Sequence, residues 1–140
     1  MKILFMCVAN SARSQIAEGL ARQLWADSVE IASAGSKPSR VNPHAEAVLK
    51  EIGAQTEVLH SKSVDDLPAS FIDKLDFVIT LCAEEVCPVI ISKAKKLHWP
   101  LPDPAGHTGS DAEQLDRFRS TIAQLKPRLV EFGREYGILR

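Results

Sequence analysis

The chain has 140 residues, a net charge of -1, and 45% hydrophobic and 25% charged residues, which is the composition of an ordinary globular protein. This length suits one domain with a sizeable core, so we expect a single domain over residues 1–140. Its basic residues are scattered, and no apolar run nears the roughly 20 residues of a membrane span. These features argue against nucleic-acid and membrane partners, so any anion must be bound by a local site.

The N-terminal run "MKILFMCV" could suggest a signal peptide, but polar residues interrupt it from Asn10 onward. We therefore expect a cytoplasmic protein, in a compartment that keeps thiols reduced. The chain has three cysteines. An odd number argues against a closed disulfide framework and leaves reactive thiols open.

The first half of the chain alternates strand and helix patterns. Residues 2–8 are an apolar run of strand length, and apolar residues recur at helical spacing from Ser14. Residues 29–35 alternate apolar with small or polar side chains and end in a glycine turn, which predicts a second strand. Residues 42–53 predict a helix with Asn42 as its N-cap.

The second half continues this alternation. Residues 75–82, rich in β-branched and aromatic side chains, predict a strand that is buried on both faces. Residues 83–96 predict a shorter helix, and residues 97–99 a short strand. From Ser110, apolar residues recur at alternating steps of three and four and predict a last helix, which Pro127 should kink or break.

Together these elements predict an α/β sandwich around a parallel sheet of about four strands. Ligands of such sheets bind at the carboxyl ends of the strands. The stretch "CVANSARS", Cys7–Ser14, lies just past the end of the first strand. Its position is therefore that of an active site.

The same stretch has the chemistry of an oxyanion site. A loop that leads into a helix presents backbone N–H groups at the positive end of the helix dipole, and Arg13 adds a planar fork of donors. These groups favour the thiolate of Cys7, and Ser14 could donate one more hydrogen bond to it. Asn10 tolerates the left-handed backbone that such a loop needs. The arrangement predicts a thiolate nucleophile beside a bound oxyanion.

Two other interpretations apply to this stretch. A cysteine in an apolar strand is usually a buried structural residue, but strand, loop, Arg-Ser and helix in register favour a functional one. A nucleotide-binding loop is excluded because the pattern G-x-x-x-x-G-K-[ST] is absent.

The segment "CVANSARSQIAEGLAR" resembles the phosphate-binding loop of the low-molecular-weight tyrosine phosphatase fold, and especially that of the arsenate reductases built on it. The similarity extends through "SAGS", "SKSVDDL", "LDFVITLC" and "HWPLPDPAG", and so covers most of the chain. It implies a three-layer sandwich whose four-stranded parallel sheet has the order 2-1-3-4. It also implies Cys7 as nucleophile and an oxyanion-binding loop made of Val8, Ala9, Asn10, Ser11, Ala12, Arg13 and Ser14.

Two further cysteines suggest a redox relay. Cys82 ends the strand at residues 75–82, at the sheet edge where we expect Cys7, and Cys87 follows five positions later. Taken alone, each fits a buried structural role equally well. Resemblance to the thioredoxin-coupled arsenate reductases implies that a thiol-arsenate adduct on Cys7 is resolved by Cys82 and then by Cys87, with thioredoxin as final reductant. The segment "AEEV" between the two is shorter than usual in that family, so glutathione with glutaredoxin stays an alternative.

Asp103, followed by proline in "PLPDPAG", matches the general acid of the family. By itself, Asp-Pro would more simply indicate a turn. Ala105 and Gly106 follow where the tyrosine phosphatases typically have an aromatic residue. This more open rim favours a small inorganic oxyanion.

The resemblance also implies a potassium ion, because Asn10, Glu18, Ser33 and Asp65 match positions that hold this ion in some arsenate reductases. Alternatively, Glu18 faces solvent or a loop backbone and Asp65 caps a turn. A zinc site is disfavoured because the cysteine spacing and the histidines form no usual motif. We expect no tightly bound cofactor besides potassium.

The sequence thus predicts a monomeric cytoplasmic arsenate reductase, with phosphate or sulfate as competing oxyanions. Two alternatives stay open. One is a tyrosine phosphatase that uses Cys7, Arg13 and Asp103 alone, and the other is a non-catalytic oxyanion-binding or redox-sensing module.

Overall fold

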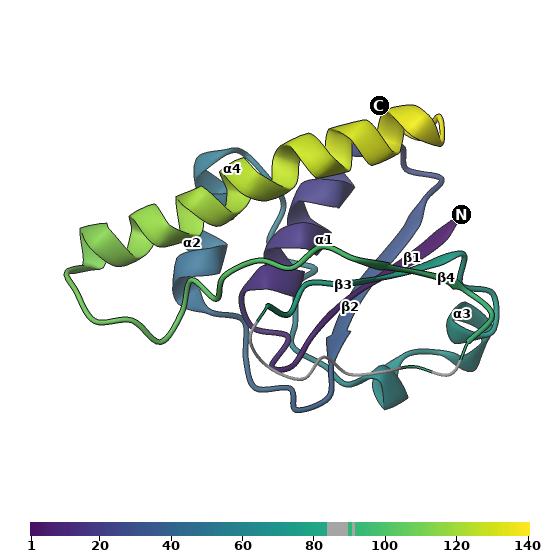
Figure 1. The fold of residues 1–140 in the computed structure, drawn as a ribbon, viewed down its shortest axis with the longest axis horizontal. Helices are drawn as coiled ribbons and strands as arrows, with labels where there is room; N and C mark the ends of the chain where they lie inside the picture. The colour runs from purple at the N-terminus through teal and green to yellow at the C-terminus, as the bar shows by residue number, and fades with distance from the viewer. Residues whose placement is uncertain (84–89, 91) are drawn as a thin grey trace.

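The protein was analysed as a computed structural model that describes residues 1–83, 90 and 92–140 (Figure 1). Strands and helices alternate along the chain, as the sequence predicts. In chain order the elements are β1 (Lys2–Cys7), α1 (Arg13–Leu24), β2 (Glu30–Gly35), α2 (Pro43–Glu51), the 3-10 helix η1 (Val64–Asp66), α3 (Ala69–Ile72), β3 (Phe77–Thr80), β4 (Lys95–His98) and α4 (Asp111–Glu135).

The strands form one parallel sheet in the order β2-β1-β3-β4, which confirms the predicted order. The register places Met6 of β1 opposite Ala34 of β2 and Thr80 of β3. Each crossover is a helix or a longer segment, as parallel pairing requires. All four strands therefore end at one edge, and the loop after β1 lies there with the segments that follow β2 and β3.

Helices α1, α2 and α4 cover one face of the sheet, and η1 and α3 lie on the other (Figure 1). The predicted three-layer sandwich is therefore confirmed. The larger core lies under α1 and α4, where the fully buried Trp25 packs between Phe5 and Phe132. Its indole Nε1 donates to the carbonyl of Leu129 at 2.9 Å, so the buried ring leaves no unmet donor. This packing fixes α1, and with it the loop that precedes α1.

The predicted helix at residues 83–96 is wrong at its C-terminal end. Lys95 and Lys96 belong to β4 and pair with Phe77 and Val78 of β3. Both lysines are exposed, as suits an edge strand, and their charge hid this strand from an apolar pattern. Residues 83, 90 and 92–94 are not helical either, so the prediction is also wrong there. Residues 84–89 and 91, on which the remainder of the prediction falls, lie outside the described residues.

The predicted break at Pro127 is also wrong, because α4 runs from Asp111 to Glu135 with Pro127 inside it. Proline removes the hydrogen bond to the carbonyl four residues earlier. Here both Pro127 and Ala123 are exposed, so water can satisfy that carbonyl. On the opposite side of the helix, Leu125 and Leu129 are fully buried and hold the two halves on one core.

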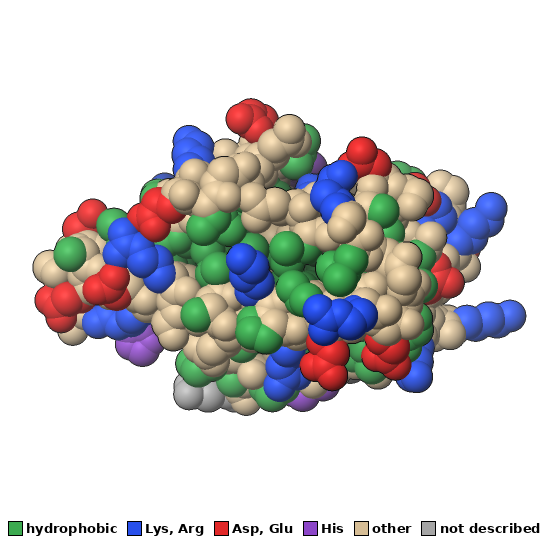
Figure 2. All heavy atoms as spheres, turned by 90° about the horizontal axis from the view of Figure 1, so that it is seen from above, with side chains coloured by type: hydrophobic (Ala, Val, Ile, Leu, Met, Phe, Trp, Pro, Cys, Tyr) green, Lys and Arg blue, Asp and Glu red, His purple; other side chains and the backbone are tan. Residues whose placement is uncertain are grey.

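On the face seen in Figure 2, acidic and basic side chains are interspersed, in keeping with the small net charge. Among the described residues, no helix is both long enough and apolar enough to cross a membrane.

Candidate active site

The loop after β1 lies between two neighbouring strand ends. Cys7, the last residue of β1, is paired with Gly35 at the end of β2. On the other side, Leu81 N donates to Met6 O at 3.0 Å, so the chain after β3 continues beside β1 toward the same edge. Cys82 is the next residue. The sheet therefore delivers Cys7 and Cys82 to the same edge from neighbouring strands, as we expected.

Gly35 lets the two strand ends approach closely. A Cβ atom at this position would lie 2.3 Å from Val8 O and 2.9 Å from Asn10 N, closer than real Cβ contacts. Only glycine fits against the loop backbone here without a shift of that backbone. The glycine that ends the "SAG" pattern is thus a structural part of the loop, and the sequence indicated only a turn there.

The loop points its carbonyl groups away from its centre. Val8 O, Ala9 O and Ser11 O accept hydrogen bonds from backbone N–H groups of the segment 37–42 at 2.9 to 3.2 Å. Within the described part of the chain, the N–H groups of residues 9–12 have no acceptor. A buried or half-buried donor without a partner destabilises the folded protein unless a ligand accepts a hydrogen bond from it. The loop is therefore a cradle of donors that suits an oxyanion.

Cys7 belongs to a buried hydrogen-bond chain with Ser14 and Asn10. Ser14 Oγ lies 2.9 Å from Cys7 Sγ and accepts from Asn10 Nδ2 at 2.7 Å. Because Asn10 occupies Ser14 as an acceptor, the hydroxyl proton of Ser14 is free to point at the sulfur. Asn10 itself has a φ of 47°, the left-handed conformation that asparagine tolerates. The chain thus provides a hydrogen-bond donor for a thiolate at Cys7.

Arg13 and Asp103 form the polar wall of the site. The Arg13 side chain is buried, its Nη1 donates to Leu101 O at 3.0 Å, and its Nη2 lies 3.8 Å from Asp103 Oδ2. Leu101 N in turn donates to Leu81 O at 3.1 Å, which ties the Asp103 loop to the end of β3. The Asp103 side chain is half exposed and also accepts from Ala105 N in a turn. Asp103 therefore lies beside Arg13, and its loop also contains the turn that Asp-Pro alone indicates.

The two described cysteines differ in state. Cys7 is a buried free thiol, whereas Cys82, also buried, is disulfide-bonded. Cys87 lies outside the described residues.

Three buried or half-buried residues that support the loop were not predicted. Gln15 Nε2 donates to Asn10 O, Asn10 Oδ1 and His60 O, each at 3.0 Å. Ser61 Oγ donates to Ala9 O, and Lys62 N donates to Asn10 Oδ1 at 3.0 Å. Gln15 stands inside the loop motif, so its position was a usable signal. The segment with Ser61 and Lys62 is far from the loop in sequence, and no local pattern indicated its contact.

The predicted potassium ligands are placed in part as expected. Ser33 Oγ donates to Glu18 Oε1 at 2.7 Å, and both residues are fully buried on the far side of the loop. Arg22 Nε donates to the other oxygen of Glu18 at 2.9 Å, and Lys62 Nζ lies 3.8 Å from Glu18 Oε1. Burial lowers the pKa of Lys62, and the Glu18 carboxylate opposes this effect. Asp65 lies in η1 with an exposed side chain, whereas Glu18 and Ser33 are buried.

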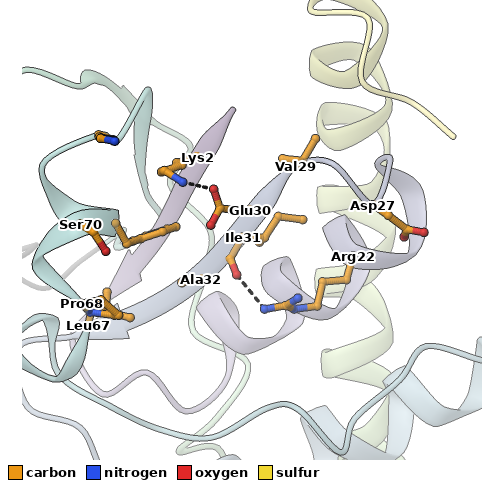
Figure 3. Close-up of a pocket in the computed structure, with 12 residues that line it drawn as sticks. Lys2, Arg22, Asp27, Val29, Glu30, Ile31, Ala32, Leu67, Pro68 and Ser70 are labelled. Carbon is orange, nitrogen blue, oxygen red and sulfur yellow. Dashed lines mark hydrogen bonds and ion pairs between the residues drawn. The ribbon is translucent and has the colours of Figure 1, made fainter.

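A hollow lies at the opposite end of the sheet, between the amino ends of β1 and β2 and helix α3 (Figure 3). Its volume is about 520 Å³. Lys2 and Glu30 on its wall form an ion pair, and Arg22 Nη2 donates to Ile31 O at 2.7 Å. Its lining contains no cysteine, so it lacks the thiol found at the other end of the sheet.

Comparisons with known proteins match this site and this fold. A family model described as low molecular weight phosphotyrosine protein phosphatase matches residues 2–135. The arsenate reductase of Halalkalibacterium halodurans is 36% identical over 133 residues, covering 94% of each chain.

Two solved structures are similar over nearly all of this chain. One, described as an arsenate reductase in the phosphate binding state, is 31% identical with a TM-score of 0.75, over 96% of this chain and 97% of that one. The other is the thioredoxin-dependent arsenate reductase of Corynebacterium glutamicum, 30% identical with a TM-score of 0.71, over 96% of this chain and 60% of that one. The chain therefore belongs to the low molecular weight phosphotyrosine protein phosphatase family, among its arsenate reductase relatives.

Proposed function

We propose that this protein reduces arsenate to arsenite at Cys7 and is regenerated by thioredoxin. The observation that carries the proposal is the free Cys7 thiol, which lies between the hydroxyl of Ser14 and a cradle of unpaired N–H donors. Relatives named arsenate reductases match nearly the whole chain, and they support the choice of substrate.

In the first step, the loop amides and Arg13 bind the arsenate oxygens. The Cys7 thiolate forms a sulfur–arsenic bond, and one arsenate oxygen departs. The departing oxygen is that of an arsenate hydroxyl, so one proton from Asp103 makes it leave as water. Ser14 stabilises the thiolate before attack, and Arg13 neutralises the oxyanion charge.

The second and third steps move two electrons. The Cys82 thiolate attacks Cys7 Sγ, the sulfur–arsenic bond breaks, and its electron pair leaves with arsenic as arsenite. Cys87 then attacks Cys82, frees the Cys7 thiolate and leaves a disulfide between Cys82 and Cys87. The disulfide-bonded Cys82 and free Cys7 of the structure match the distribution of oxidation expected after this exchange.

The last step needs a dithiol that returns two electrons to the Cys82–Cys87 disulfide. Thioredoxin supplies such a dithiol, and the thioredoxin-dependent enzyme of Corynebacterium glutamicum supports this choice. Glutathione with glutaredoxin is the alternative, because only four residues separate the two cysteines.

The test is NADPH consumption with arsenate, thioredoxin and thioredoxin reductase. We expect arsenate-dependent turnover that Cys7→Ser, Cys82→Ser and Cys87→Ser each abolish, while Lys126→Met, on the exposed face of α4, retains it. Turnover with glutathione and glutaredoxin but not with thioredoxin would identify the former pair as the reductant. Turnover that persists in Cys82→Ser would overturn the relay.

The second candidate function is hydrolysis of a phosphate monoester, which the family description favours. It needs Cys7, Arg13 and Asp103 but neither of the other cysteines. Ala105 and Gly106 beside the acid offer no aromatic ring for a substrate tyrosine. Hydrolysis of an aryl phosphate without any arsenate reduction would favour this candidate, and binding without either reaction would leave an oxyanion-binding module.

A further inference from the structure

The residues behind the loop do not fit the potassium ion that the resemblance implies. Asn10 Oδ1 already accepts from Lys62 N and Gln15 Nε2, and the two oxygens of Glu18 accept from Ser33 and Arg22. Asp65 is exposed elsewhere. Among the described residues, Gln15 Oε1 is the one buried side-chain oxygen here without a partner. The oxygens of Asn10 and Glu18 thus already accept hydrogen bonds, and an alkali cation, which takes a ring of oxygen donors, would have to share or displace these partners.

A buried lysine lies where that cation would be needed. Lys62 is 8% exposed, its Nζ donates to His60 O at 3.0 Å, and it lies 3.8 Å from Glu18 Oε1. Arg22 approaches the same carboxylate from α1 and also holds Ile31 O of β2 (Figure 3). The Glu18 carboxylate therefore already has two basic partners. A third positive charge would be repelled by both of them in a buried setting.

Lys62 is also connected to the anion loop. Its backbone N–H donates a hydrogen bond to Asn10 Oδ1. Asn10 Nδ2 donates to the hydroxyl of Ser14, which lies beside Cys7 Sγ. Its ammonium donates a hydrogen bond to His60 O, which also accepts one from Gln15 Nε2. Gln15 Nε2 in turn donates to the backbone and side-chain oxygens of Asn10. Lys62 thus contacts the Glu18 carboxylate through its ammonium and the Asn10 side chain through its backbone N–H.

We propose that Lys62 is a positioning residue whose tethered ammonium takes the place of a bound potassium ion beside Glu18, so that this chain forms its oxyanion loop without potassium. Loss of this ammonium leaves Glu18 with a single basic partner and makes the potential behind the loop more negative. Anion binding should then weaken, although Lys62 does not touch the anion. The inference goes beyond arsenate reduction, because it concerns only how the loop binds an oxyanion.

The test measures binding of inorganic phosphate by calorimetry, together with the melting temperature, at constant ionic strength in potassium or sodium chloride. We expect wild-type affinity and melting temperature to be the same in both salts. In Lys62→Met, the affinity for phosphate should fall about tenfold. This corresponds to the loss of one positive charge that acts on the anion through a partly buried part of the protein. Lys62→Arg should retain affinity within about threefold, because it restores the charge.

Lys126→Met, which removes an exposed lysine on α4, is the matched control and should behave as wild type. A melting temperature of the wild type that rises in potassium but not in sodium would overturn the proposal. So would wild-type affinity in Lys62→Met, or equal losses in Lys62→Met and Lys62→Arg. If Lys62→Met does not fold, the salt comparison on the wild type and the affinity of Lys62→Arg still decide it. None of these readouts depends on arsenate turnover.

Discussion

The two ends of the same parallel sheet treat polar groups in opposite ways. At the carboxyl end, the loop after β1 keeps its N–H donors unpaired and holds a free thiol against Ser14. At the amino end, a hollow of about 520 Å³ is lined by no cysteine, and Lys2 and Glu30 on its wall pair with each other. The difference teaches that unmet donors around a thiol, and not a hollow alone, single out the carboxyl end as the candidate active site.

The most demanding test of this difference replaces one side chain at the carboxyl end of the sheet and one at the amino end. Cys7→Ser should lower arsenate turnover by at least about 10³-fold, because the hydroxyl replaces the only thiolate of the loop. Lys2→Met, at the other end, should leave turnover within about twofold, as expected for a surface change. Steady-state assays on both variants check this. Equal losses would show that the two ends are not functionally distinct.

The next largest effect concerns the contact between β2 and the loop. Gly35→Ala should destabilise the protein by about 1–3 kcal/mol and weaken phosphate binding, because the new Cβ would displace Val8 O or Asn10 N. Urea unfolding and calorimetry measure the two effects.

Gly137→Ala is the matched control for this substitution. Gly137 has a φ of 66° and open space around it, so alanine there should cost about 1 kcal/mol through backbone strain alone. Its phosphate affinity should stay at the wild-type value. A loss of affinity in this control would mean that the loop responds to stability in general.

A smaller effect should follow from removal of one hydroxyl. Ser14→Ala leaves Cys7 Sγ without its hydrogen bond and Asn10 Nδ2 without an acceptor. Alkylation of Cys7 by iodoacetamide at neutral pH should slow about tenfold, since a charge-assisted hydrogen bond contributes about 1.5–3 kcal/mol and part of it can be replaced by water. Peptide mass spectrometry follows the modification at Cys7. An unchanged rate would exclude Ser14 as a donor to the thiolate.

The smallest effect lies away from both ends of the sheet, at the start of α4. Hydrogen bonds from Ser110 lower the pKa of Glu113 from its ordinary value of 4.5. Between that lowered pKa and 4.5 the unfolded chain binds more protons than the folded one, so stability rises with pH. This contribution is complete above about pH 4.5 and is lost as the pH falls through the folded pKa.

The free energy of unfolding of Glu113→Gln, measured with urea, should therefore fall less on acidification than that of the wild type. Its phosphate affinity at neutral pH should stay unchanged. An identical acid dependence of the two proteins would contradict the role of this cap.

Local signals predicted much of the fold and the centre of the site. Asn42 and Ser110 cap their helices as the sequence indicates, and the strand–loop–helix pattern located Cys7 and Arg13. These features depend on residues close in sequence, where periodicity and capping chemistry are informative.

What escaped prediction depends on contacts between distant segments. Lys62 and Leu101 meet the loop only because the sheet order brings them there, and neither has a local pattern that says so. The path of α4 through Pro127 depends on burial of its other face. The two lysines of β4 are stabilised by pairing with β3 and not by their own strand propensity.

The central claim is that Cys7 reacts with arsenate and passes the oxidation to Cys82 and Cys87. The most direct measurement is a single turnover of the fully reduced protein with equimolar arsenate and no reductant, followed by arsenite quantification and disulfide mapping by mass spectrometry. The account predicts one arsenite per protein, a disulfide between Cys82 and Cys87, and a free thiol at Cys7. Arsenite formation with Cys82 and Cys87 still reduced, or no arsenite at all, would contradict it.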